Sequence, residues 1–226
     1  MNTRVDRSGR EYAGSQRQIQ TYVNHCAAKL SSKIAEAFSD VQVGADEIEW
    51  VSPLAREQYA EYRDEDFLRA VGLSQYSSQL ASFWPRRGPC WDALARYRNG
   101  CILVEAKSHI EEIYGGGCAA SEKSLAVIRA SLVVTKQWLR VPADADWLGH
   151  LYQSANRYAY LYFLLEVVKV PCYLVNVYFT DDPRTPTSED EWQNAIREVN
   201  RELRLSAETP YCRSVILPAH SGLVSI

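Results

Sequence analysis

The sequence predicts an α/β fold in which helices flank a mixed central β-sheet, and three observations support it. Apolar residues recur with helical spacing over residues 120–139 and 147–168. Two apolar segments, 91–97 and 101–106, flank a short turn. A run rich in Val, Tyr and Phe covers residues 172–180. This order of hairpin, helices and strand predicts parallel and antiparallel strands in one sheet between helical layers.

The composition is that of a globular protein, since 46% of the 226 residues are hydrophobic and 23% are charged. Six Trp, fourteen Tyr and five Phe exclude a chain that stays unfolded. The longest apolar run, residues 158–165, is much shorter than the ~20 residues of a membrane-spanning helix. The amino-terminal residues are polar, so we expect no secretory leader and a cytoplasmic protein.

We expect a flexible tail over residues 1–14 and a single α/β domain over the remainder of the chain. The domain would comprise a helical N-terminal region (15–83), a core (84–180) and a C-terminal extension (181–226). The six cysteines form no CxxC pair and no zinc spacing with histidine, so we expect reduced thiols.

The N-terminal region begins with an expected helix over residues 15–38. A short β-branched segment, broken by Gly44, follows at 41–51, and another short helix is expected at 73–83. The apolar face of the first helix comprises Ile19, Tyr22, Val23, Cys26 and Leu30.

Ser52 and Pro53 have the pattern of a helix start, with serine as the N-cap and proline at the first helical position. We expect this helix to continue to near Gly72 and to carry an acidic face. Glu57 and Glu61 are four residues apart, so they would share one side of it.

Residues 98–100, Arg-Asn-Gly, are typical of the turn that joins two antiparallel strands. The second strand, 101–106, begins with a continuous apolar run, as expected for a strand covered on both faces. Downstream, Asp146 is the expected N-cap of helix 147–168, whose apolar C-terminal half should be buried. The other expected elements are loops at 84–89, 115–117 and 181–188, a helix at 189–203 and a strand at 215–217.

Three ionisable residues stand at the expected strand ends of the hairpin: Asp92, Glu105 and Lys107. Glu105 and Lys107 are two residues apart on a strand, so they point to the same side. The start of one hairpin strand lies beside the end of the other, so Asp92 should approach Glu105. Two convergent carboxylates suit Mg²⁺. Lys107 could then orient or deprotonate a water and balance phosphate charge.

The residues Gly88-Pro89-Cys90-Trp91-Asp92, followed by Glu105-Ala106-Lys107, resemble the PD-(D/E)xK phosphodiesterase superfamily, the restriction-endonuclease-like nucleases. Asp92 matches the acid of the loop-strand, although two residues separate it from Pro89. Glu105 and Lys107 match the E-x-K strand. The resemblance covers about residues 85–180 and implies a restriction-endonuclease-like core with an added N-terminal helical region.

The resemblance implies a Mg²⁺- or Mn²⁺-dependent nuclease that hydrolyses phosphodiester bonds, with DNA as the first expected substrate. Asp92 and Glu105 would bind the metal, and Lys107 would orient the attacking water. The implied partners are a nucleic acid and, in a homodimer, a second copy of the chain, and no membrane is implied.

Members of this superfamily often add an acid from an earlier helix and a polar residue from a later one. Glu61 is the expected third metal ligand, with a solvated acidic face as the alternative. Gln153 fits the first position of a Gln…Tyr pair found in recombination-type members, and it joins the expected catalytic set. Arg157 stands where that tyrosine would be. The later helix carries a polar stripe that needs buried partners or a ligand: His150, Gln153, Asn156, Arg157 and Tyr160.

The whole chain is acidic, with a formal charge of −3, so a nucleic-acid site must be local. Residues 84–140 contain nine Arg or Lys and five Asp or Glu, whereas residues 46–66 contain eight acids and two Arg. The basic part therefore holds the motif. Five cations are expected to contact phosphates, each with a solvated position as its alternative: Arg86, Arg87, Arg129, Lys136 and Arg157.

Two alternatives remain open at this point. The chain could be a catalytically inactive protein of the nuclease fold that serves as a binding or scaffold subunit. It could also be a protein-interaction domain in which the charged cluster is a structural ion pair and aromatic residues near Trp138 or Trp147 form the interface. The sequence does not distinguish DNA from RNA.

Overall fold

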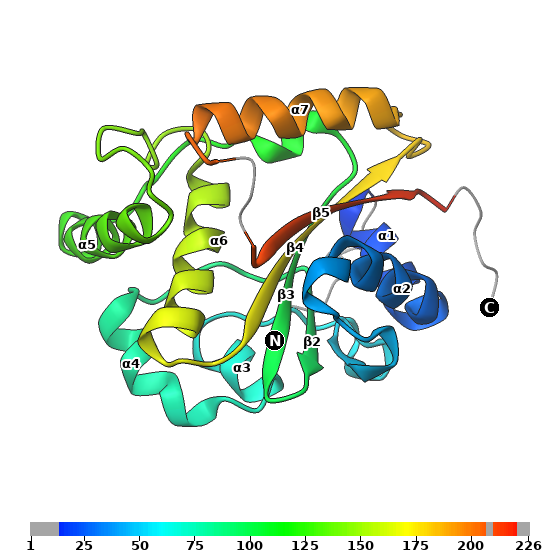
Figure 1. Cartoon of the computed structure of the whole chain (residues 1–226), viewed down its shortest axis with the longest axis horizontal. Coiled ribbons are helices and arrows are strands. Elements are labelled where there is room, and N and C mark those ends of the chain that lie inside the picture. Colours follow the sequence, from blue (N-terminus) through cyan, green and yellow to red (C-terminus); the bar gives the residue numbers. More distant parts are fainter. Residues whose placement is uncertain (1–13, 207–209, 221–226) are drawn as a thin grey trace.

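The computed structural model describes residues 14–206 and 210–220, and it confirms the predicted α/β class. A five-stranded mixed sheet, in the order β1-β2-β3-β4-β5, lies between layers of helices (Figure 1). β1, β2 and β3 pair in antiparallel fashion, whereas β3, β4 and β5 are parallel. The predicted tail falls almost wholly outside the described residues. The strands are β1 (Ile48–Ser52), β2 (Ala93–Tyr97), β3 (Gly100–Lys107), β4 (Cys172–Thr180) and β5 (Cys212–Pro218).

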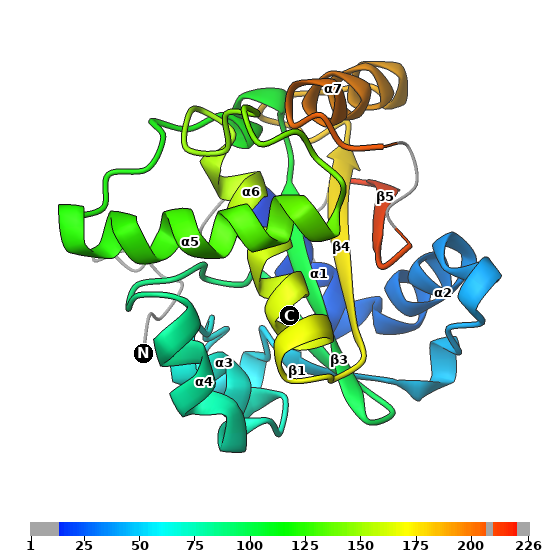
Figure 2. The ribbon, with the colours of Figure 1, turned by 60° about the vertical axis from the view of Figure 1, so that its left-hand side comes forward.

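Helices flank the sheet on both faces (Figure 2). The α-helices are α1 (Ser15–His25), α2 (Ala27–Ala37), α3 (Asp64–Ala70), α4 (Ser77–Phe83), α5 (Glu122–Trp138), α6 (Tyr152–Tyr162) and α7 (Glu189–Glu202). Single 3-10 turns are η1 (Ser39–Val41), η2 (Ala45–Glu47), η3 (Ala55–Glu57), η4 (Ser74–Tyr76) and η5 (Ile110–Ile113), and η6 (Phe163–Val167) continues α6 as a π-helix.

β3 is the middle strand, and its side chains alternate between two apolar cores. Ile102 and Val104 pack with α1 and α2 on one face. Leu103 packs on the other face with the helices α3 to α7. Glu105 and Lys107 continue the second face, so the charged end of β3 projects toward the layer that contains α6.

The hairpin of β2 and β3 forms as predicted. Tyr97 pairs with Gly100, and Arg98 between them adopts a left-handed backbone with φ of 49°. The predicted strand at 172–180 and helix at 189–203 are confirmed as β4 and α7. Ser188 and Glu191 form a capping box at the start of α7, which explains why the helix begins there.

The helix predicted from Ser52 to Gly72 is wrong over its first half. Ser52 is the last residue of β1 and pairs with Leu94, and its hydroxyl donates to the Ala60 carbonyl at 2.9 Å. The helix α3 begins only at Asp64. Pairing in the sheet therefore overrides the local Ser-Pro signal, and Glu57 and Glu61 do not share a helix face.

Two other boundaries differ from the prediction. The helix expected over 15–38 divides at Cys26, whose φ of −133° separates α1 from α2. Asp146 does not cap α6, which begins at Tyr152. Its carboxylate instead accepts hydrogen bonds of 3.0 Å from the backbone N–H groups of Leu148 and Gly149. The aspartate caps a turn ahead of the helix.

Strands from all three expected segments of the chain enter the same sheet. The N-terminal region, expected to be helical apart from a short β-branched segment, contributes β1, and the C-terminal extension contributes β5. All six cysteines are free thiols, as predicted. Cys101 and Cys172 face each other across β3 and β4 with their sulfurs 3.8 Å apart.

Candidate active site

The hairpin register brings Asp92 to the end of β3. Asp92 immediately precedes β2, and its backbone N–H donates to the Val104 carbonyl at 3.2 Å. Its carboxylate accepts a hydrogen bond of 2.8 Å from the backbone N–H of Ala106, the residue between Glu105 and Lys107. The structure thus places the predicted trio together, at the edge where the parallel strands β3 and β4 end.

Glu105 and Lys107 point to the same side of β3 and form an ion pair, with Lys107 Nζ 2.6 Å from Glu105 Oε1. Both side chains are largely buried, at 15% exposure for Lys107 and 10% for Glu105. A buried charge needs a partner, and this pair satisfies one oxygen of the glutamate.

Arg157 of α6 satisfies the other oxygen. Its Nε and Nη2 atoms lie 2.7 Å and 2.6 Å from Glu105 Oε2. The remaining donors reach the side chain of Asn156 at 2.7 Å and the Cys90 carbonyl at 3.3 Å. The guanidinium also lies over the Trp91 ring, 5.0 Å from its centroid. Arg157 therefore joins α6 to the strand end and to the segment before Asp92.

The charges within the cluster set its protonation. Burial alone would raise the pKa of Glu105, but Arg157 and Lys107 outweigh it, and this pKa lies below its usual value. Burial would lower the pKa of Lys107, but Glu105 and Asp92 outweigh it, and that pKa is raised. Lys107 is therefore an ammonium ion, and Glu105 a carboxylate, at neutral pH.

The loop that leads into Asp92 is fixed by Asp64 and by a close helix contact. Asp64 accepts hydrogen bonds of 2.9 Å from the N–H groups of Arg87 and Gly88. A β-carbon on Gly88 would lie 1.9 Å from the hydroxyl oxygen of Tyr160 on α6. Only glycine allows the backbone to pass so close to α6. This close packing explains why a glycine stands in the predicted loop at 84–89.

Gln153 lies at the exposed start of α6. It lines a pocket of about 20 Å³ together with Glu105, Lys107 and Arg157. A space of this size holds about one water. The structure therefore places Gln153 beside the trio, whereas its catalytic role stays a prediction. His150 of the same polar stripe is exposed and lies 2.6 Å from Glu202.

Glu61 lies in the extended segment before α3 and not on a helix. Its Oε2 atom accepts a hydrogen bond from the Cys90 thiol at 3.7 Å, and the adjacent Tyr62 forms a β-bridge with Trp91. This places Glu61 beside the segment that leads to Asp92. Among residues 14–206 and 210–220, no three His, Cys, Asp or Glu side chains are grouped closely enough to hold a metal ion.

The predicted phosphate contacts divide into three kinds. Arg86, Arg87 and Arg129 are exposed, and Arg87 lines a hollow that is also lined by Gly115, Gly116 and Gly117.

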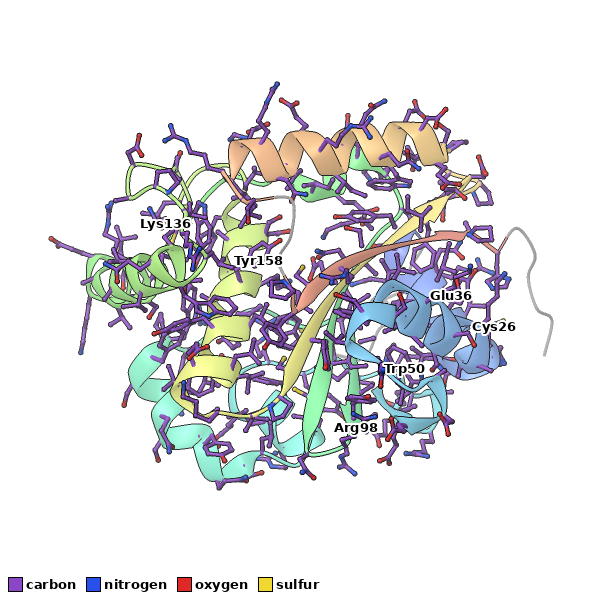
Figure 3. All side chains as sticks on the ribbon, in the orientation of Figure 1. Cys26, Glu36, Trp50, Arg98, Lys136 and Tyr158 are labelled. Carbon is purple, nitrogen blue, oxygen red and sulfur yellow. The ribbon has the colours of Figure 1, made fainter. Side chains whose placement is uncertain are left out.

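Lys136 instead donates to the Ala143 and Ala145 carbonyls at 2.8 Å and 3.0 Å. Its side chain points from α5 toward the loop that contains these two alanines (Figure 3). Burial lowers the pKa of Lys136. Arg157 is 7% exposed and paired with Glu105, so it does not lie on the surface as a phosphate contact would.

The sequence did not single out Asn176 and Tyr178 of β4. Asn176 pairs in register with Glu105, and Tyr178 with Lys107. Both residues line the small pocket beside the trio. The signal was available, because an amide in the middle of the apolar run from Cys172 to Thr180 is costly unless it has a use.

Comparison of the chain with protein-family models, curated proteins and solved structures returned no match. No helix in the described part of the chain has the length and apolar character needed to cross a membrane.

The alternative of an interaction domain with an aromatic interface near Trp138 or Trp147 loses Trp147. This side chain is buried at 1% exposure, and it donates to the Leu203 carbonyl. The function is therefore inferred from the geometry of the trio.

Proposed function

We propose that the protein is a Mg²⁺-dependent phosphodiesterase with a restriction-endonuclease-like core that hydrolyses nucleic acid, with DNA as the first candidate. One observation carries the proposal. The Asp92 carboxylate is seated on the backbone N–H between Glu105 and Lys107, so two acids and a lysine meet at one sheet edge.

The position of the trio in the fold supports this proposal. Ligand sites of open α/β sheets lie outside the carboxyl ends of the parallel strands. Glu105 and Lys107 end β3 at the boundary between its antiparallel partner β2 and its parallel partner β4. The resemblance implies the order strand, strand, helix, strand, and the chain has β2, β3, the helices α5 and α6, and then β4.

The donor set fits Mg²⁺, which is commonly held by one or two carboxylates together with waters and substrate phosphate. Asp92 and Glu105 would hold the ion. A bound Mg²⁺ would stabilise the negative charge that builds on the phosphodiester during attack. The residues around Glu105 would keep it ionised, since Arg157 and Lys107 lower its pKa.

Lys107 would act as a hydrogen-bond donor and not as a base, because its raised pKa keeps it protonated. It would orient the attacking water and balance phosphate charge. The water oxygen forms a new bond to phosphorus while the bond to the leaving oxygen breaks. Bulk water takes the proton lost by the nucleophile and supplies the proton that the leaving oxygen gains.

A non-catalytic binding protein is the second candidate, and a specific observation favours it. Each oxygen of Glu105 already has a cationic partner, Lys107 on one and Arg157 on the other. The four charges of Asp92, Glu105, Lys107 and Arg157 cancel, which weakens the attraction for a divalent ion.

Cleavage assays distinguish the two candidates. Purified protein is incubated with labelled single-stranded DNA, duplex DNA and RNA, in Mg²⁺, in Mn²⁺ and in EDTA. We expect metal-dependent cleavage by the wild type and a loss of about 100-fold or more in Lys107→Met and Asp92→Asn. Lys169→Met and Asp66→Asn, at exposed ion pairs, are the matched controls and should cleave like the wild type.

Unchanged cleavage in Lys107→Met would overturn the proposed mechanism. An absence of cleavage in every metal, combined with measurable nucleic-acid binding, would support the non-catalytic candidate instead. Thermal unfolding of each variant shows whether a loss of cleavage comes from the site or from the fold.

A further inference from the structure

A cavity of about 750 Å³ lies beside the trio, walled by α6, α7, β4 and β5. Its volume lies within the range of about 300–1,000 Å³ that is usual for ligand pockets. Tyr158 projects from α6 into the region that α7 and β5 frame (Figure 3). The cavity has no part in the mechanism described above.

Polar side chains lead from the trio across the sheet toward this cavity. Glu105 of β3 is in register with Asn176 of β4, which is in register with Ser214 of β5. All three lie on the same face of the sheet, where Glu105 is buried, Asn176 is half-buried and Ser214, on the edge strand β5, is exposed. The row leads from the buried Glu105 to the exposed Ser214, so it offers a ligand hydrogen-bonding groups along this face of the sheet.

The cavity adjoins the small pocket of the trio. Four side chains line both spaces: Ser154, Arg157, Asn176 and Tyr178. A ligand in the cavity would therefore contact the same side chains that line the small pocket of Glu105 and Lys107.

The walls of the cavity combine flat, polar and apolar groups. Tyr158 and Tyr178 supply aromatic rings, and Asn176, Asn200 and Ser214 supply neutral donors and acceptors. Burial raises the pKa of both tyrosines, so their hydroxyl groups stay neutral donors. Ile196 and Val199 of α7 add apolar surface. A planar ring with hydrogen-bonding edges suits such walls, and nucleobases are bound by stacking together with edge contacts.

We propose that this cavity holds one unpaired nucleotide of the strand whose phosphodiester lies at Asp92, Glu105 and Lys107, an inference that rests on the proposed function. The substrate is then a single strand. A base that stays stacked within a duplex cannot enter a cavity between helices and a sheet.

Binding measured without cleavage tests this proposal. Fluorescence anisotropy in EDTA compares a labelled single strand of about 12 nucleotides with the duplex of the same sequence. We expect the single strand to bind at least about tenfold more tightly, in line with the usual contribution of base stacking. Ser214→Trp, which fills the cavity from β5, should weaken single-strand binding about tenfold or more and leave duplex binding unchanged.

Two further variants complete the design. Ser78→Trp, at an exposed position of α4, is the matched control and should bind like the wild type. Asn200→Phe narrows the cavity from α7, so it gives an independent reading if Ser214→Trp unfolds at a lower temperature. Equal affinity for single strand and duplex, or unchanged single-strand binding in both filled variants, would overturn the inference.

The outcomes also separate the inference from the proposed function. Metal-dependent cleavage that survives both fillings with unchanged single-strand binding would overturn the cavity assignment and leave the nuclease in place. Single-strand binding that both fillings abolish, in a protein that cleaves nothing, would support the cavity and overturn the nuclease.

Discussion

Arg157 holds the Glu105 carboxylate through two nitrogens of its guanidinium, Nε at 2.7 Å and Nη2 at 2.6 Å from the same oxygen. The pair links α6 to the end of β3, two elements that are far apart in the sequence. It fixes one of the two proposed metal ligands, so the stability of the fold and the geometry of the site depend on the same contact.

Arg157→Met should destabilise the protein by about 3 kcal/mol, because it removes one of the two cations that pair with the buried Glu105 carboxylate. Urea denaturation measures the free energy of unfolding. Arg204→Met is the matched control, since Arg204 contacts Asp144 with both groups well exposed. The control should change stability by less than about 1 kcal/mol. Equal losses in the two variants would show that the Arg157 pair is not a strong contact.

Acidification should remove the contribution of the Arg157–Glu105 pair to the free energy of unfolding. The pKa of Glu105 in the folded protein lies below its usual value of 4.5. Its stabilising effect is therefore present above about pH 4.5 and is lost as the pH falls through the lower, folded-state pKa. We expect the difference in unfolding free energy between wild type and Arg157→Met to shrink over that interval. A difference that stays constant or grows on acidification would contradict the assignment of the pair.

Gly88→Ala should destabilise the loop before Asp92 by more than about 1 kcal/mol, because the new methyl group would overlap the Tyr160 hydroxyl. Adding Tyr160→Phe removes that oxygen and should restore part of the loss, as a double-mutant cycle measures. Gly116→Ala is the control, since a β-carbon there has no neighbour within 4 Å. A neutral Gly88→Ala variant would show that the loop can move away from α6.

The sequence predicted an element correctly where its local pattern did not conflict with strand pairing elsewhere in the sheet. β4 has the predicted bounds because an aromatic and β-branched run there is flanked by loop residues. The Ser52-Pro53 signal failed because β1 extends to Ser52 through pairing with β2. No local pattern reports that pairing, so the acid expected from a helix, Glu61, lies in an extended segment.

The meeting of Asp92, Glu105 and Lys107 could be predicted, because a two-residue hairpin turn fixes which residues lie opposite each other. The pairing of Glu105 with Arg157 could not, since it depends on how α6 packs against the sheet. The same packing leaves the cavity beside Asn176. The contact between Arg157 and Glu105, and the positions of Asn176 and Tyr178 beside the trio, are therefore the parts of the site that required the structure.

Anomalous diffraction from a crystal soaked in Mn²⁺ tests the central claim most directly. The account predicts a density peak shared by the carboxylates of Asp92 and Glu105, with Lys107 moved off the glutamate oxygen. Asp92→Asn crystals, soaked in the same way, should lose the peak. A wild-type crystal with Glu105 still held by Lys107 and Arg157, and without density beside either carboxylate at millimolar Mn²⁺, would contradict the proposed metal site.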